Sequence, residues 1–329
     1  MANVHPGLLL YSIDTNALFS DALAAALGVP LAPHEHRRFE DGEGKLRPLT
    51  DPRGCDAYVV QSLYGDDQNS PHDKLFFLWA FIATLLDHGA ARVTAVTPYL
   101  AYARKDRQTK PFDPLTLRYV AQLFESVGTS QLMVLEAHNV AAFQSAFRIP
   151  ALQLPAHSLF DPLVAELLGQ DQSVAVAVAS PDPGGVKRAQ LWRESLEAHL
   201  HRPVGFAMVD KRRSAGLVSS ENLVAGEVKG AMVLLIDDLI ASGDTMRRAA
   251  TALKQAGARE VRVFAAHGLL TGVAVDALAD PVIDQIVVTD SVPTFRLPQG
   301  CVTHSKLTVV SAAPLFARAI QACHAAWRL

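Results

Sequence analysis

The sequence predicts an α/β fold in two domains, each a mostly parallel sheet flanked by helices. Short apolar runs alternate with segments of helical periodicity along nearly all of the 329 residues. This alternation is typical of parallel sheets that helices cover on both faces. The length suits two domains of ordinary size, since one domain usually holds about 100–200 residues. We place the join at Pro150–Pro155, which gives expected domains of residues 1–153 and 154–329.

The first half reads as strand and helix in turn. GLLLYSI (7–13) is a strand candidate, and the helical pattern over 16–27 is ended by a glycine. A second strand, DAYVVQSL (56–63), precedes a helical segment at 73–88. The remaining strand candidates of this half are RVTAVT (92–97) and QLMVLEAH (131–138).

The second half repeats the plan with further apolar runs. Its strand candidates are SVAVAVAS (173–180), MVLLIDD (232–238), VRVFAAHG (261–268) and QIVVTD (285–290). Apolar residues recur at helical spacing after the second of these runs, which predicts a helix from about Thr245 to Gly257. We find no strict sequence repeat between the halves, although both follow the same order of elements.

The composition is that of a soluble globular protein, with half of the residues apolar and 19% charged. A net charge of −3 gives no electrostatic case for binding nucleic acid or an anionic membrane. The most apolar long window, 75–86, is too short to span a membrane, and residues 1–13 lack the basic leader of a signal peptide. Three cysteines without close spacing argue against a disulfide framework or a cysteine-based zinc site, so we expect a reducing cytoplasm.

The stretch VLLIDDLIASGDT (233–245) carries the strongest functional signal. Ligands of open parallel sheets bind beyond the carboxyl ends of the strands, and here an apolar strand runs into Asp237 and Asp238. The turn that follows offers backbone amides and hydroxyls at a helix N-terminus, which suits a phosphate. Adjacent carboxylates repel unless cations or sugar hydroxyls accompany them. A phosphorylated sugar with Mg²⁺ explains the whole stretch, whereas an ordinary turn with Asp244 as a helix cap is the simpler interpretation.

Three other positions are weaker when each is taken alone. Asp182 lies in SPDPGG, where two glycines let the backbone approach a ligand, but a plain Pro-Gly turn fits as well. His138 ends a strand, and a lone histidine is more often structural than a metal ligand. Lys211 and Arg213 belong to a cationic run, which is either a solvated face or a clamp for a polyphosphate.

The order of these motifs resembles the ribose-phosphate pyrophosphokinase family, also called PRPP synthetases. The resemblance covers nearly the whole chain. It implies two phosphoribosyltransferase-like domains and the Mg²⁺-dependent reaction of ATP with ribose 5-phosphate to give AMP and PRPP. It also implies a homo-oligomer, a dimer or a hexamer built from dimers. The motifs that carry it are RRFEDGE (37–43), PYLAYARKDR (98–107), EAHN (136–139), SPDPGGVKR (180–188), VDKRR (209–213), VLLIDDLIASGDT (233–245) and TVVSAAPLFARAI (308–320).

On the sugar side, the resemblance assigns the ribose hydroxyls to Asp237 and Asp238. The same comparison places Lys211 and Arg213 in a mobile catalytic loop. The residues that would hold the 5-phosphate are Ala241, Ser242, Gly243, Asp244 and Thr245.

On the nucleotide side, the resemblance assigns Mg²⁺ on the ATP phosphates to His138 and Asp182. Arg104 and Lys105 would lie beside ATP. The residues that would meet the adenine and ribose of ATP, from a neighbouring subunit, are Phe39, Asp41 and Glu43.

The phosphate turn departs from the family's usual D-T-x-G-T pattern. Ala241 removes a carboxylate, and Asp244 adds a charge beside the expected phosphate. Backbone amides still supply most of the cradle, so we interpret the turn as altered but functional. Elsewhere EAH replaces the usual DLH, and Lys105 and Thr109 replace a usual glutamine and a usual aspartate near ATP.

Two alternatives stay open at this point. A non-catalytic PRPP synthetase-associated regulator would share the resemblance, but the uninterrupted 210–230 segment favours an enzyme. A phosphoribosyltransferase that consumes PRPP would also use the Asp237 turn. The ATP-type motifs at 39–43 and 102–106 weigh against it.

Overall fold

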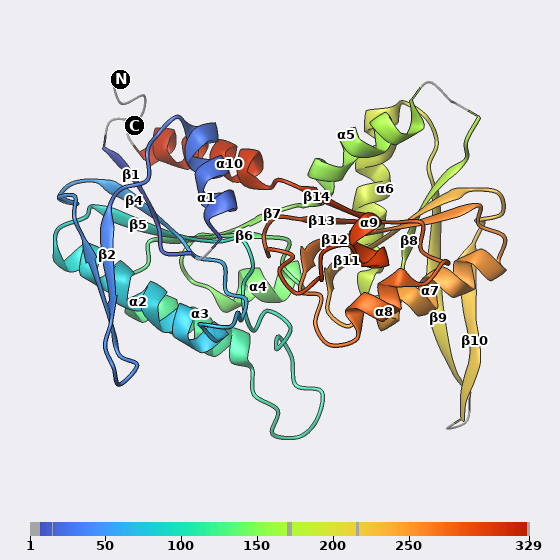
Figure 1. Cartoon of the computed structure of the whole chain (residues 1–329), viewed down its shortest axis with the longest axis horizontal. Coiled ribbons are helices and arrows are strands. Elements are labelled where there is room, and N and C mark those ends of the chain that lie inside the picture. Colours follow the sequence, from blue (N-terminus) through green and yellow to red (C-terminus); the bar gives the residue numbers. More distant parts are fainter. Residues whose placement is uncertain (1–6, 15, 170–172, 215–216, 328–329) are drawn as a thin grey trace. The chain divides into compact units, whose positions relative to one another are not determined.

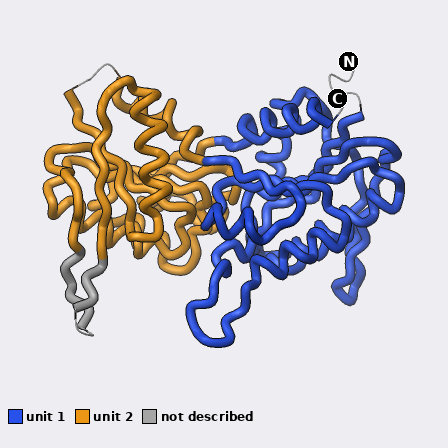
Figure 2. The backbone as a smooth tube through the Cα atoms, turned by 180° about the vertical axis from the view of Figure 1, so that it is seen from behind, with its two compact units in different colours: residues 1–155, 311–329 blue, residues 156–310 orange. Residues whose placement is uncertain are grey.

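The computed structural model describes residues 7–14, 16–169, 173–214 and 217–327, and the side chains of 211–222 lie outside this description. The chain forms two compact units (Figure 2). Unit 1 consists of Met1–Pro155 and Ser311–Leu329, and unit 2 of Ala156–Val310. No helix in the described part of the chain is long and apolar enough to cross a membrane.

Unit 1 contains a parallel sheet whose strands lie side by side in their order along the chain. The described strands lie in the order β1-β4-β5-β6-β7, and each neighbouring pair is parallel. The mostly parallel sheet expected from the apolar runs is thus confirmed. The strands are β1 (Leu8–Ser12), β4 (Asp56–Val60), β5 (Arg92–Thr97), β6 (Gln131–Leu135) and β7 (Ala151–Leu154).

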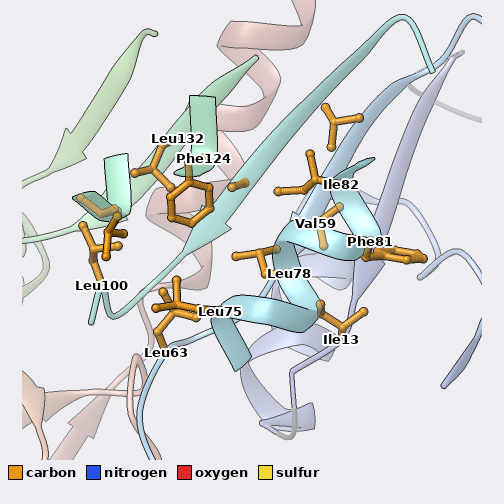
Figure 3. Close-up of a cluster of buried hydrophobic side chains, with 14 of the residues drawn as sticks. Ile13, Val59, Leu63, Leu75, Leu78, Phe81, Ile82, Leu100, Phe124 and Leu132 are labelled. Carbon is orange, nitrogen blue, oxygen red and sulfur yellow. The ribbon is translucent and has the colours of Figure 1, made fainter. Parts of the chain in front are cut away.

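Helices cover both faces of this sheet, with α1 and α10 on one face and α2 and α3 on the other (Figure 1). The helices of unit 1 are α1 (Ala17–Leu27), α2 (Pro71–Asp87), α3 (Thr116–Ser126), α4 (Val140–Ala146) and α10 (Ala313–Trp327). Figure 3 shows the core beneath α2, where Leu78 and Ile82 lie with Val59 of the sheet. Each such fully buried aliphatic side chain contributes about 1.5–3 kcal/mol.

The start of α2 follows from a capping box. The Ser70 hydroxyl accepts a hydrogen bond from the Asp73 amide at 3.2 Å, and the Asp73 carboxylate accepts one from the Ser70 amide at 2.8 Å. Two amides that the helix itself leaves unpaired are satisfied in this way. Pro71 stands at the first helical position, where its missing N–H costs nothing.

The last helix belongs to unit 1, although we expected residues 154–329 to form one domain. In α10, His324 Nδ1 donates to the Asp56 carboxylate of β4 at 2.9 Å. The rings of Phe316 in α10 and Phe19 in α1 meet edge to face, with centroids 5.6 Å apart. These contacts explain why residues 311–329 group with the first unit instead of the second.

A polar hairpin that the sequence analysis did not predict precedes β4. Strands β2 (His34–Arg38) and β3 (Gly44–Pro48) pair antiparallel. The hairpin lies on α2, where the His36 ring meets the edge of Phe77 at 4.9 Å between centroids. A Cβ at Gly44 would stand 2.3 Å from the Phe77 ring, so only glycine fits this approach.

Unit 2 contains a larger sheet in the order β10-β9-β8-β11-β12-β13-β14 over its described residues. All neighbouring pairs are parallel except β9 with β10. The strands are β8 (Val176–Ser180), β9 (Gly205–Ser214), β10 (Leu217–Gly226), β11 (Met232–Ile240), β12 (Glu260–Gly268), β13 (Gln285–Thr289) and β14 (Leu307–Val310).

Helices α5 and α6 cover one face of this sheet, and α7 and α8 cover the other (Figure 1). The buried Asp161 of α5 accepts hydrogen bonds from Trp192 Nε1 at 2.8 Å and Ser195 Oγ at 2.6 Å, which fixes α5 against α6. The helical elements of unit 2 are α5 (His157–Leu168), the 3-10 helix η1 (Pro183–Gly185), α6 (Val186–Leu200), α7 (Asp244–Gln255), α8 (Ala274–Ala279) and α9 (Val302–Ser305).

Candidate active site

The paired aspartates lie near the carboxyl end of β11, which is paired on one side with β8 and on the other with β12. The strand continues through both residues to Ile240, two residues beyond its expected end. Asp238 is buried, and Asp237 is partly buried. Both carboxylates therefore lie at the edge of the parallel sheet where ligands usually bind.

Arg188 supplies the counter-charge for this pair. Its Nη1 lies 3.1 Å from Asp237 Oδ1 and 3.7 Å from Asp238 Oδ1. The Asp238 amide also donates to Asp237 Oδ1 at 2.9 Å. Burial raises the pKa of the Asp237 carboxyl well above its ordinary value, and the charge of Asp238 raises it further, whereas the Arg188 guanidinium lowers it.

The turn after β11 leads directly into α7, as expected. Gly243 has φ 77 and precedes the first helical residue, Asp244. A Cβ at Gly243 would come 3.0 Å from Leu278, so this position requires glycine for its backbone angle and for its packing. The Asp244 carboxylate does not cap the helix; its Oδ1 lies 3.4 Å from Arg247 Nη2. The first amides of α7 therefore remain available to an anion.

Asp182 lies just beyond β8, the neighbour of β11. Its Oδ1 accepts hydrogen bonds from the amides of Gly184 at 2.9 Å and Gly185 at 3.2 Å. The Ser180 hydroxyl donates to the Asp182 carbonyl at 2.6 Å. These contacts fix the carboxylate at the carboxyl edge of the sheet, next to the strand that carries the paired aspartates.

His138 lies in unit 1, two residues after Glu136, which follows β6. Glu136 has φ 40, a conformation that non-glycine residues rarely adopt, and its amide donates to the Leu154 carbonyl at 2.9 Å. Asn139 then caps α4 by accepting from the Ala142 amide at 3.2 Å. The strand expected over 131–138 therefore ends earlier, at Leu135, and His138 lies in the short segment between β6 and α4. The metal role that the resemblance assigns to His138 and Asp182 stays a prediction.

The residues expected to meet the base of ATP form the tip of the β2–β3 hairpin. Phe39 is 41% exposed, and Arg37 lies over its ring at 5.1 Å. Asp41 Oδ1 accepts from the Glu43 amide at 3.0 Å, and the Phe39 amide donates to the Glu43 carbonyl at 2.8 Å. The tip is therefore an ordered turn that presents an aromatic ring and the exposed carboxylates of Glu40, Asp41 and Glu43.

Arg104 and Lys105 are exposed in a turn between β5 and α3. The Lys105 amide donates to the Tyr102 carbonyl at 2.9 Å, and its carbonyl accepts from the Leu117 amide at 3.2 Å. Farther along, Asp113 accepts from the Thr109 hydroxyl at 2.7 Å. These hydrogen bonds hold the backbone of the turn and leave both cations at its surface.

Two family models match the chain. The model of the N-terminal domain of ribose phosphate pyrophosphokinase matches residues 8–128, and the phosphoribosyl synthetase-associated domain matches residues 218–327. The ribose-phosphate pyrophosphokinase of Caldanaerobacter subterraneus is 35% identical over 325 residues, which is 98% of this chain and 97% of the relative. That of Clostridium tetani is 32% identical over 322 residues, 98% of this chain and 95% of the relative.

A solved structure agrees with these matches. The phosphoribosylpyrophosphate synthetase from Mycobacterium smegmatis is 31% identical, with a TM-score of 0.83. The match covers 96% of this chain and 98% of that one. This chain belongs to the ribose-phosphate pyrophosphokinase family. The relatives' names favour a pyrophosphokinase over the two alternatives, a non-catalytic regulator and a phosphoribosyltransferase.

Lys211 and Arg213, the residues that the family resemblance assigns to catalysis, have side chains outside the described residues. The expected loop is wrong as a description of the backbone, because both residues fall within the bounds of β9. This strand pairs antiparallel with β10. Their roles in pyrophosphokinase chemistry stay predictions.

The sequence analysis missed the role of Arg188. The motif SPDPGGVKR was quoted, but only Asp182 was assigned from it. A signal was present, because a cation in the first turn of a helix opposes the helix dipole and needs another reason to be there. The structure supplies the reason in the two carboxylates of β11.

Proposed function

We propose that this chain is a ribose-phosphate diphosphokinase that transfers the diphosphoryl group of ATP to O1 of ribose 5-phosphate. The products are PRPP and AMP. The observation that carries the proposal is the succession of Asp237, Asp238 and the N-terminus of α7 at one sheet edge, in a chain of this family. This arrangement can bind a sugar diol and a phosphate at the same time.

The reaction moves one group between two oxygens. A bond forms between O1 of the ribose and the β-phosphorus of ATP, and the bond from that phosphorus to the oxygen shared with the α-phosphorus breaks. AMP keeps the bridging oxygen, and the proton of the O1 hydroxyl is released. Such a transfer depends mainly on positioning and on stabilisation of phosphate charge. It requires no covalent nucleophile from the protein.

On the sugar side, Asp237 and Asp238 accept hydrogen bonds from the ribose hydroxyls, and the amides of 241–245 hold the 5-phosphate. The hydroxyls of Ser242 and Thr245 add donors at the same helix terminus. The loss of a carboxylate at Ala241 leaves this backbone cradle in place.

On the nucleotide side, Phe39, Asp41 and Glu43 meet the adenosine of ATP bound by a neighbouring subunit. Their position on an exposed hairpin tip supports this role, because an exposed aromatic ring and two carboxylates suit a base and ribose hydroxyls. Arg104 and Lys105 lie beside ATP as well. The active form is therefore a homo-oligomer, a dimer or a hexamer.

The metal of this reaction is Mg²⁺, with His138 and Asp182 beside the ATP phosphates. No group of three or more His, Cys, Asp or Glu suited to a metal occurs among the described residues. The Asp182 carboxylate fits Mg²⁺, which usually takes one or two protein carboxylates and completes its shell with water and substrate phosphates. Both amides at Asp182 donate to Oδ1, so its second oxygen can act as a ligand. Bound Mg²⁺ neutralises phosphate charge during the transfer.

The decisive experiment incubates the purified protein with ATP, Mg²⁺ and ribose 5-phosphate and measures AMP and PRPP. AMP and PRPP in equal amounts are expected. Intact ATP with ribose 5-phosphate and other phosphosugars would overturn the proposal.

A variant then locates the sugar site. Asp238→Ala is expected to raise the KM for ribose 5-phosphate about 10- to 100-fold, the loss of one hydrogen bond to a charged group, and to change the KM for ATP little. The matched control is Asp276→Ala, at an exposed aspartate of α8. Equal losses for both substrates would remove Asp238 from the sugar site.

A further inference from the structure

Arg188 lies where it contacts both carboxylates of β11, although it belongs to a different element of the fold. It stands in the first turn of α6, and its side chain is only 11% exposed. Its guanidinium faces both carboxylates, so one positive charge of the described residues acts on the two negative charges of the ionised pair.

A close approach of the backbone brings Arg188 to the paired aspartates. Gly185 precedes α6, and a Cβ there would stand 2.7 Å from Ser180 Oγ and 3.8 Å from Arg188 Nη1. Glycine thus lets the start of α6 approach the end of β8 closely. The position gives α6 no benefit, since a cation in the first turn opposes the helix dipole.

We propose that Arg188 is a positioning residue that holds Asp237 and Asp238 ionised and oriented for the ribose hydroxyls. The inference rests on the proposed function and names the group that prepares its sugar site. A guanidinium hydrogen bond fixes the direction of Asp237 Oδ1. Burial and the mutual repulsion of the two carboxylates both favour their protonation. The positive charge of Arg188 opposes these two effects and favours the ionised form. Arg188 acts through the aspartates and makes no contact with the transferred group.

The consequence is a pH-dependent sugar site. Ionised carboxylates accept hydrogen bonds from both hydroxyls of a diol, whereas a protonated one competes as a donor. Loss of the Arg188 charge raises the pKa of the pair, so the ionised state forms only at higher pH. Among the described side chains, the charged groups that act on Asp237 are Arg188 and Asp238. The acid limb of kcat/KM for ribose 5-phosphate then moves to higher pH.

The test compares Arg188→Gln, Arg188→Lys and the control Arg193→Gln with the wild type. Arg193 lies on the same helix and pairs with Glu197 at 3.3 Å, away from the paired aspartates. Arg188→Gln is expected to raise the KM for ribose 5-phosphate about 10- to 100-fold, and the KM for ATP less than about twofold. The acid limb shifts upward in this variant. Arg188→Lys, which keeps the charge but not the planar fork, falls between it and the wild type.

The outcomes separate this inference from the proposed function. A wild type without PRPP formation refutes the function itself. An active wild type with an unchanged acid limb in both Arg188 variants, or with equal increases in both KM values, refutes the role of Arg188. If Arg188→Gln does not fold, Arg188→Lys decides alone. A raised KM for ribose 5-phosphate with an upward acid limb supports the role, and wild-type behaviour overturns it.

Discussion

His324 and Asp56 lie 268 residues apart in the sequence and are joined by a buried hydrogen bond of 2.9 Å. The carboxylate of Asp56 has no exposed surface and also accepts from Arg92 Nε at 2.9 Å and from the Tyr58 hydroxyl at 2.9 Å. A carboxylate held by an arginine is an acceptor, so His324 Nδ1 carries the proton that it donates. This network fixes the final helix on the sheet of unit 1.

His324→Ala is expected to lower the free energy of unfolding by about 1–3 kcal/mol, because a buried carboxylate loses one of its donors. The measurement is urea unfolding followed by circular dichroism. The control is His304→Ala, at an exposed histidine of α9. If both variants unfold at the same urea concentration, the link between α10 and β4 contributes nothing to stability.

The raised pKa of Asp237 should lower the free energy of unfolding as the pH rises. Its folded-state pKa is raised, chiefly by burial, so between its unfolded and folded pKa values only the folded chain holds the proton. Stability is greatest below the unfolded pKa of about 4 and falls as the pH rises through the folded pKa.

Asp237→Asn removes this dependence, since asparagine keeps Oδ1 as an acceptor but never ionises. The variant is expected to melt at a higher temperature than the wild type at pH 8, with a smaller difference at pH 4. Differential scanning calorimetry at both pH values measures this. A difference that grows toward pH 4 would contradict the raised pKa. Because we propose that the same carboxylate binds ribose, the more stable variant should also lose activity.

Shared ATP sites can be tested by mixing subunits. Phe39→Ala and Asp238→Ala are each expected to remove most of the activity at substrate concentrations near the wild-type KM, because one variant lacks the proposed hairpin contact and the other the proposed sugar contact. In mixed oligomers, a subunit with an intact Asp238 meets a neighbour with an intact Phe39. Random mixing in equal amounts then restores about one quarter of the wild-type activity over all oligomers, since each intact partner is present with a probability of one half. In purified mixed dimers, one of the two sites is intact, so about one half of the wild-type activity is expected.

The experiment is co-expression of the two variants with different tags, followed by two-step purification and assay. Mixed oligomers with no more activity than the two separate variants would place both contacts within one subunit. Full wild-type activity in a protein that is monomeric at the assay concentration would exclude the shared site altogether.

Much of the fold followed from apolar periodicity, because the buried strands are continuous apolar runs. Segments such as 232–236 are buried on both faces, and their sequence shows it. The β2–β3 hairpin has no such signal: residues 34–38 are polar, and none of them is buried. Its position depends on Gly44 and on the ring of Phe77, which no local pattern connects.

Some residues of the candidate site could be predicted from the sequence, and others could not. Asp237 and Asp238 could be predicted because charged residues at the end of an apolar run form a local pattern in the sequence. Arg188 could not be placed, because its role depends on how α6 crosses β11. The return of 311–329 to unit 1 was missed for a similar reason, since it rests on His324 meeting Asp56 across the whole length of the chain.

Lys211 and Arg213 provide the last prediction, which rests on their charge and on the family resemblance. During diphosphoryl transfer, negative charge is redistributed over the moving group and the departing AMP. Cations that are better placed for the transition state than for bound ATP lower the barrier. Lys211→Ala and Arg213→Ala are each expected to lower kcat by about 10²–10³, roughly 3–4 kcal/mol, with much smaller changes in KM.

Steady-state kinetics at saturating ATP and ribose 5-phosphate measures this loss of kcat. The control is Lys229→Ala, at an exposed lysine of the turn before β11. A solvated cationic face predicts almost no effect, because exposed charges contribute little. Near-normal kcat in both variants would therefore exclude this segment from the mechanism.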